Sequence, residues 1–82
     1  MNNNKKYVKL PVVFLDKEQS ELMGKNIFIE TELNVNTDIV IGYYSYFDKD
    51  ANGDSREFVK LLCAGNSFTV PLTLLQVQNI IY

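Results

Sequence analysis

Histidine and tryptophan are absent from this chain of 82 residues, and cysteine occurs once, at Cys63. Without a second cysteine or any histidine, the chain cannot form a zinc finger, a C-x-x-C redox site, a Cys/His catalytic pair or an internal disulfide. Cys63 lies in the apolar run 59–64, where a lone thiol most often behaves as a small buried hydrophobe, the alternative being a reactive or metal-binding thiol. These features fit a reducing, cytoplasmic location.

Catalytic signatures are also lacking. The chain has no glycine-rich phosphate loop, no serine in a nucleophile-elbow context and no carboxylate pair clearly placed across a cleft. Glu30 and Glu32 share one face of an expected strand and are typical of a solvent-exposed edge. We therefore expect a protein that is not an enzyme and carries no cofactor, with weak calcium binding as the one possible exception.

Long hydrophobic runs are missing too. No segment approaches the ~20 apolar residues that a membrane-spanning helix needs. The run at residues 10–15 follows three lysines, but it is shorter than the about 7–15 residues of a signal-peptide core and is followed by charged residues instead of a cleavage site. The sequence predicts no membrane contact and no export by the general route.

Basic residues are too few for a protein that binds nucleic acid by neutralising phosphates. The formal net charge is −2 and the pI is about 4.9, and Arg56 is the single arginine. Nucleic acid is therefore an unlikely partner. Asparagine, lysine, isoleucine, tyrosine and phenylalanine are abundant, a bias that A+T-rich coding sequence produces, which indicates a phage or an A+T-rich bacterium as the source.

What is present fits one small folded domain spanning residues 1–82. Apolar residues make up 46% of the chain and charged residues 22%, a composition typical of globular proteins. The polar residues 1–4 are expected to be a frayed tail. A domain of this size buries only roughly 60% of its unfolded surface, so self-association would offset a thin margin of stability.

Alternating apolar and polar positions predict five strands, at residues 7–15, 26–33, 39–47, 56–64 and 68–70. Residues 16–25 are expected to form a loop or a short helix ending at Gly24, and residues 34–38 a turn. The period changes after Pro71, where Thr73 can cap a helix with Leu74, Val77 and Ile81 on one face. The predicted fold is mainly β, a small five-stranded antiparallel open barrel of SH3-like or OB-like architecture with a short C-terminal helix.

Two local features refine this prediction. Pro11 cannot donate a hydrogen bond to a neighbouring strand, so it places the first strand at a sheet edge or at a bulge. Gly65 and Asn66 are expected to form a two-residue hairpin turn, because both residues tolerate positive φ angles.

The segment 48–54 has the ligand spacing of the first half of a calcium-binding loop. Gly53 stands at the bend of such a loop, but Val59 occupies the position of the carboxylate that would close it. The flanking residues have the pattern of strands, whereas an EF-hand needs helices there. Too few oxygens remain for a strong site, so calcium binding would be weak, and the alternative is a solvated hairpin loop. The candidate metal ligands are Asp48, Asp50, Asn52 and Asp54.

Aromatic residues provide the second candidate site. If Tyr46 lies opposite Arg56 and Tyr44 opposite Phe58, these side chains share one face with Val40, while Tyr43, Phe47, Val59 and Leu61 point to the other. Either a partner covers the aromatic face, or a strongly curved barrel buries it. The same rings could stack on bases, as in small barrels that bind single strands. The candidate binding residues are Phe28, Tyr44, Tyr46, Arg56, Phe58 and Lys60.

These observations favour a non-enzymatic interaction module that self-associates through the aromatic face or through exposed strand edges. One alternative is a small barrel that captures nucleic acid or a nucleotide-like molecule. Another is a phage-encoded accessory or inhibitor protein that acts on a host or virion protein.

Overall fold

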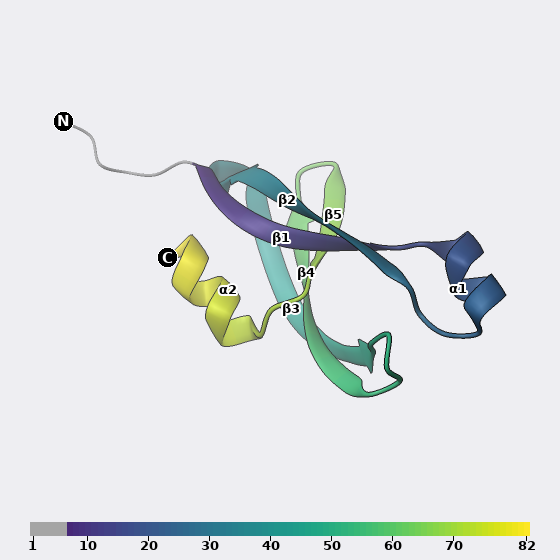
Figure 1. Ribbon diagram of the computed structural model, residues 1–82. Helices are drawn as coiled ribbons and strands as arrows, with labels where there is room; N and C mark the ends of the chain where they lie inside the picture. The colour runs from purple at the N-terminus through teal and green to yellow at the C-terminus, as the bar shows by residue number, and fades with distance from the viewer. Residues whose placement is uncertain (1–6) are drawn as a thin grey trace.

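The computed structural model describes residues 7–82 and contains five strands and three short helices (Figure 1). The tail expected at residues 1–4 lies outside the described residues. Within residues 7–82, no helix has the length and apolar character to cross a membrane. The elements are β1 (Tyr7–Leu15), α1 (Lys17–Met23), β2 (Phe28–Asn36), the 3-10 helix η1 (Thr37–Ile39), β3 (Val40–Lys49), β4 (Ser55–Cys63), β5 (Asn66–Val70) and α2 (Leu74–Ile81).

The strands form one antiparallel sheet in the order β2-β1-β5-β4-β3. Strands β2 and β3 are the two edges, yet only η1 connects them in the chain, so the sheet must curl to bring the end of β2 near the start of β3. The Ala64 N–H donates to the Ile39 carbonyl over 3.0 Å and ties this corner to the β4–β5 turn. The predicted five-stranded open barrel with a short C-terminal helix is confirmed, and the sheet remains unclosed between β2 and β3.

The hydrophobic core lies on one face of this curled sheet and is covered by α2 (Figure 1). Val77 of α2 is fully buried against strand residues, as the predicted helix face requires. Val8, Leu33, Val40, Tyr43, Leu74 and Ile81 pack around the margin. The buried centre consists of Leu10, Val12, Val35, Val59, Leu61, Cys63, Val70 and Val77.

Helix α2 is held at its N-terminus by two sets of hydrogen bonds. Thr73 and Gln76 form a reciprocal capping box, and the Glu57 carboxylate of β4 accepts from the Leu74 N–H over 2.8 Å. A carboxylate at a helix N-terminus also interacts favourably with the helix dipole. The prediction that Thr73 caps this helix is confirmed, and Glu57 fixes where the helix sits on the sheet.

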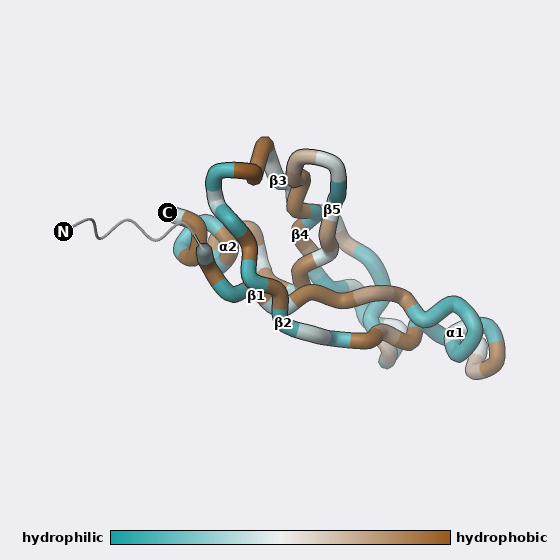
Figure 2. Tube along the Cα trace, turned by 90° about the horizontal axis from the view of Figure 1, so that it is seen from above, coloured by the Kyte–Doolittle hydropathy of each residue, from teal (hydrophilic) through white to brown (hydrophobic). Residues whose placement is uncertain are grey.

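At the other end of the molecule, β1 and β2 extend as a ribbon to α1, away from α2 (Figures 1 and 2). The Asp16 carboxylate accepts from the Gln19 N–H, and Gly24 ends the helix in the left-handed conformation at a φ of 69°. The predicted short helix ending at Gly24 is therefore confirmed. None of the seven residues of α1 is buried.

Several predicted boundaries are corrected. Strand β2 continues to Asn36 because Val35 is buried opposite Val8, so tertiary packing outweighs the turn preference of the asparagines. The β4–β5 turn uses residues 64 and 65, not Gly65 and Asn66: Asn66 pairs with Cys63, and only Gly65 needs a positive φ, of 86°. The expectation that Pro11 places the first strand at an edge or a bulge is wrong, because β1 lies between β2 and β5. The registered pairing of β1 with β5 is confined to Val13 and Thr69, so Pro11 has no registered partner on β5.

The predicted register of β3 with β4 is wrong by two residues. Tyr46 lies opposite Phe58, Tyr44 opposite Lys60 and Asp48 opposite Arg56, because the turn between the strands is centred on Asn52 and not on Ala51. A shift of two keeps every side chain on its expected face. Val40 is the exception: an irregularity between Val40 and Gly42 interrupts the alternation and turns Val40 toward the core.

Cys63 is buried in the core, as predicted, and desolvation raises the pKa of its thiol. We expect the native protein to react slowly with an aromatic disulfide reagent at pH 8, and the urea-unfolded protein to react at the rate of an ordinary thiol. Cys63→Ala combined with Ala64→Cys is the matched control, because residue 64 is exposed in the turn. Fast labelling of native Cys63 would contradict its burial.

The same thiol gives stability a defined pH dependence. The pKa of the Cys63 thiol is raised in the folded state. Its contribution to the free energy of unfolding is therefore complete below the pKa of the unfolded thiol, about 8.5, and is lost as the pH rises through the pKa of the folded thiol. Urea unfolding at increasing pH should show this loss, and the loss should be smaller in Cys63→Ala. Equal pH dependence in the two proteins would contradict the assignment.

Candidate interaction site

The face of the sheet opposite α2 carries four aromatic rings in a row, here called the aromatic ladder: Phe28, Phe58, Tyr46 and Tyr44. The ring centroids of Phe28 and Phe58 lie 5.7 Å apart, those of Phe58 and Tyr46 5.8 Å, and those of Tyr46 and Tyr44 6.1 Å. Phe28 belongs to edge strand β2 and Phe58 to β4, two strands that are not neighbours. The ladder therefore links the two arms of the curled sheet.

Two cations lie against the ladder. The Arg56 guanidinium is 5.6 Å from the centre of the Phe58 ring and donates to the Pro71 carbonyl over 2.9 Å. The Lys60 ammonium is 5.8 Å from the centre of the Tyr46 ring and donates to the Thr69 hydroxyl over 3.0 Å. Each cation thus combines a cation–π contact with a hydrogen bond to another segment, which fixes its position.

The structure brings all six predicted binding residues together, but most of their apolar surface is used within the chain. Phe58 is 2% exposed and Tyr46 and Phe28 are half-buried, whereas Tyr44 is 50% exposed. A ring covered on both sides by its neighbours offers no face for a further ring. The ladder is therefore a second packing layer, and its open end is Tyr44 on β3.

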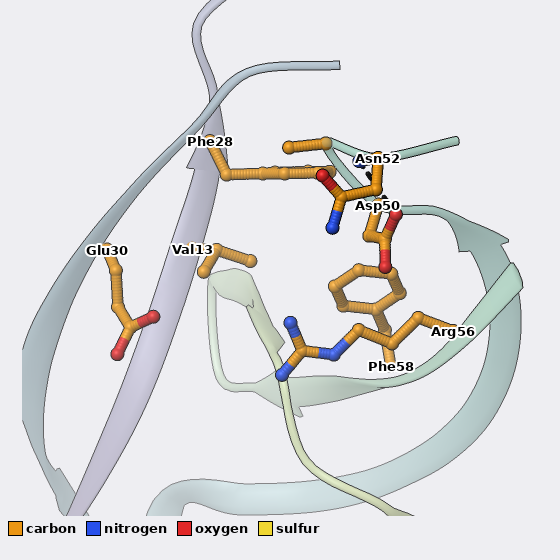
Figure 3. A pocket seen from close by; sticks show the side chains of 8 residues that line it. Val13, Phe28, Glu30, Asp50, Asn52, Arg56 and Phe58 are labelled. Carbon is orange, nitrogen blue, oxygen red and sulfur yellow. Dashed lines mark hydrogen bonds between the residues drawn. The ribbon is translucent and has the colours of Figure 1, made fainter. Parts of the chain in front are cut away.

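Two hollows flank the Phe28–Phe58 contact. One, of about 260 Å³, is lined by aromatic and charged side chains including Glu30, Asp50 and Arg56, and Figure 3 shows the Arg56 guanidinium pointing into it beside the Phe58 ring. The other, of about 350 Å³, lies beside Tyr46 and Lys60. Both hollows mix cationic with acidic groups, so neither presents a single sign of charge.

The acidic loop, residues 48–54, is a hairpin turn in which the aspartate side chains accept hydrogen bonds from backbone N–H groups of the same loop. The Asp50 carboxylate accepts from the N–H groups of Asn52 and Asp54, at 2.9 and 3.0 Å, and the Asp48 carboxylate accepts from the Lys49 N–H. In the part of the chain that the structure describes, no three acidic, cysteine or histidine side chains are grouped to hold a metal ion. The calcium site at Asp48, Asp50, Asn52 and Asp54 stays a prediction without geometric support.

The two edges of the sheet differ in chemistry. Edge strand β3 carries no charged residue from Val40 to Phe47 and exposes large apolar groups on both faces: Ile41 is 75% exposed, Tyr44 50% and Phe47 68%. Edge strand β2 exposes Glu30 and Glu32. Like charges discourage pairing between copies of β2, whereas the charges of β3, Asp48 and Lys49, are of opposite sign and lie at its end beside the loop.

Sequence reasoning missed the exposure of Phe47, which was expected to face the core. Phe47 does lie on the core side, opposite Glu57, but α2 does not extend over it. The stretch 40–47 carried no signal of an edge, since edge strands usually carry a lysine, a proline or an inward-facing charge and this stretch has none.

A third hollow, of about 430 Å³, lies where the start of β3 meets the end of α2. Gly42 and Tyr43 line one side and Ile81 and Tyr82 the other. Burial, and then a hydrogen bond and charge interaction with Tyr82, raise the pKa of Tyr43. The raised pKa keeps the Tyr43 hydroxyl uncharged at neutral pH, which leaves this side of the hollow suited to an apolar group.

Comparisons with protein-family models, curated proteins and solved structures find no significant match. The function is therefore argued from the geometry of the chain itself.

The ladder assignment predicts a contrast between two variants. Phe58→Ala should lower the free energy of unfolding by about 3–5 kcal/mol, because it removes a buried ring and leaves a cavity. Tyr44→Ala should change it by about 1 kcal/mol or less, because the ring is half in solvent and makes one ring contact. Urea unfolding at low protein concentration measures both, and equal losses would contradict the assignment.

Proposed function

We propose that this protein is a non-catalytic assembly module that pairs with a second copy of itself through edge strand β3. The observation that supports the proposal is the contrast between the edges: β3 is uncharged and apolar on both faces from Val40 to Phe47, while β2 carries Glu30 and Glu32. An exposed, uncharged edge strand with apolar side chains is a template for pairing with another strand.

A second copy is the occupant that this chemistry favours. Antiparallel pairing of β3 with β3 about a two-fold axis satisfies both open edges at once and leaves only the acidic β2 edges outside. The assembly is then closed at two subunits. A foreign extended peptide could occupy the edge in the same way, whereas a second copy brings an uncharged strand with exposed apolar side chains that this chain itself supplies.

Stability also favours pairing. The described core consists of few large side chains, and α1 contributes no buried residue. A domain of about 80 residues has a thin margin of stability, which association commonly supplements. Covering Tyr44 and Phe47 would remove apolar surface from water at roughly 25 cal/mol for each Å² buried.

The proposal predicts a concentration-dependent dimer that Tyr44→Glu converts to a monomer, since a carboxylate would be buried beside the second copy. Leu22→Glu is the matched control: it places the same charge on another exposed apolar residue, 78% exposed in α1, and should leave the dimer intact. Sedimentation velocity measures both. Ser45→Pro, which removes one N–H from the edge, is a second variant with the same expected result.

A Tyr44→Glu protein that keeps the wild-type mass would overturn the β3 assignment. If Leu22→Glu alone produced monomers, the association would belong to the α1 arm instead. Circular dichroism on each variant separates loss of pairing from loss of folding.

A small barrel that captures an anionic aromatic ligand is the second candidate, and the hollow beside Tyr46 favours it because the Lys60 ammonium lies there against an aromatic ring. It predicts that a short single-stranded oligonucleotide binds with an affinity that falls as salt rises and that is lost in Lys60→Met. Fluorescence anisotropy with labelled oligothymidine measures this. Undetectable binding at low salt would exclude this candidate for single strands. Action on a host or virion protein stays a prediction.

A further inference from the structure

We infer that the two copies pair in one register, with β3 antiparallel to β3 and the two-fold axis at Ser45, so that Phe47 of each copy lies at the mouth of the hollow beside Tyr43 of the other. This inference rests on the proposed self-association and specifies its geometry. It follows from three features of β3: which backbone N–H and C=O groups point away from β4, where the regular strand ends, and which side chains then lie opposite each other.

The backbone N–H and C=O groups that point away from β4 belong to every second residue of β3. The Asp50 N–H donates to the Asp54 carbonyl, one position beyond the Lys49–Ser55 pair, so Asp50 directs its backbone groups toward β4. Alternation along an antiparallel strand then directs those of Tyr43, Ser45 and Phe47 away from β4. A second strand must therefore form its close hydrogen-bonded pairs with these odd-numbered residues.

The irregularity between Val40 and Gly42 limits the overlap. Regular pairing of β3 with β4 covers Gly42 to Lys49, and the midpoint of that stretch lies between Ser45 and Tyr46. A two-fold axis at either residue gives the longest overlap. An axis at Tyr43 or Phe47 would leave much of one strand opposite the irregular end or opposite the loop.

The side chains distinguish the two remaining registers. With the axis at Ser45, Tyr44 lies opposite Tyr46 of the second copy and Phe47 opposite Tyr43 of the second copy, so aromatic residues pair on both faces. With the axis at Tyr46, the two copies of Tyr46 lie opposite each other, but this is the one aromatic pair: Tyr44 then lies opposite Asp48 and Tyr43 opposite Lys49. Aromatic pairs across antiparallel strands stabilise a sheet, whereas a carboxylate beside a ring does not.

The hollow between β3 and α2 supports the same register. It is lined by Gly42, Tyr43, Ile81 and Tyr82 and measures about 430 Å³. Phe47 is on the same side of the sheet as Tyr43 and is 68% exposed. Directly opposite Tyr43, the Phe47 ring of the second copy adjoins the mouth of the hollow, and the two-fold axis repeats this contact.

On the other face, the same register extends the aromatic ladder. Tyr44 is its exposed end, 6.1 Å from the Tyr46 ring of its own chain. In the pair, Tyr44 also contacts Tyr46 of the second copy, so two ladders join into one row across the axis. Both exposed rings of β3 thereby gain an aromatic neighbour.

A cysteine scan locates the axis. Single variants Tyr44→Cys, Ser45→Cys and Tyr46→Cys are oxidised under mild conditions, with the wild type, whose one thiol is buried, as background. In this register two copies of residue 45 face each other about 5.5 Å apart between Cα atoms, within disulfide range, whereas residues 44 and 46 are offset from their own copies by about 7–8 Å.

We expect Ser45→Cys to form the linked dimer at least about tenfold faster than its two neighbours, given the narrow distance range of a disulfide. An equal mixture of Tyr43→Cys and Phe47→Cys should form mixed disulfides faster than either variant alone. Fastest linking at residue 44 or 46 in a dimeric protein would overturn this register but not the use of β3. A wild-type protein that sediments as a monomer at every concentration would overturn the proposed self-association, and the register with it.

Discussion

Strand β4 is buried on both faces, and the two packing layers of the molecule meet on it. Phe58 lies under the aromatic ladder, while Val59 and Leu61, its neighbours in the strand, lie in the core beneath α2. Such a strand needs cover on both sides, and 82 residues cannot supply two complete layers. The curl of the sheet resolves this conflict, because it brings β2 round to cover Phe58 at one end while α2 covers the core at the other.

Polar residues of β4 position the elements that provide this cover. Arg56 and Glu57 are adjacent and point to opposite faces, yet both bind the segment that leads into α2: Arg56 through the Pro71 carbonyl and Glu57 through the Leu74 N–H. Arg56 also packs on Phe58. The start of α2 is therefore coupled to both layers, so the helix and the ladder depend on the same short stretch of β4.

The sequence alone predicts the elements well, because strand periodicity and helix caps are local signals. The alternation in β4, the Thr73 capping box and the αL glycine at 24 each act through nearby residues, and each appears where expected. Errors arise where distant residues decide. Val35 keeps β2 extended through two asparagines because it is buried, and the irregularity at Val40 moves one side chain to the other face. The six candidate residues were grouped correctly because a register error of two preserves the faces.

What the sequence could not give is how much of each ring remains exposed. Phe58 and Tyr44 lie two positions apart in the row and look alike in the alternating pattern, but only the curl of the sheet determines that Phe58 is covered and Tyr44 is not. The curl follows from the short η1 connection and from the Phe28–Phe58 contact, which joins residues far apart in sequence.

The same curl explains why the exposed apolar side chains collect on β3. The Phe28 ring of β2 packs against Phe58, and the exposed positions of β2 carry Glu30 and Glu32. This edge therefore exposes charge where β3 exposes apolar side chains. Strand β3 has no element beyond it in the sheet, and α2 is too short to reach Phe47. A third layer from within the chain would need further residues, whereas in the proposed dimer a second copy would supply the missing strand, at a cost in association entropy, side-chain ordering and desolvation. In this fold, the exposed edge is thus a consequence of completing two layers with too few residues, and the proposed pairing through it would cover the side chains that the chain itself leaves exposed.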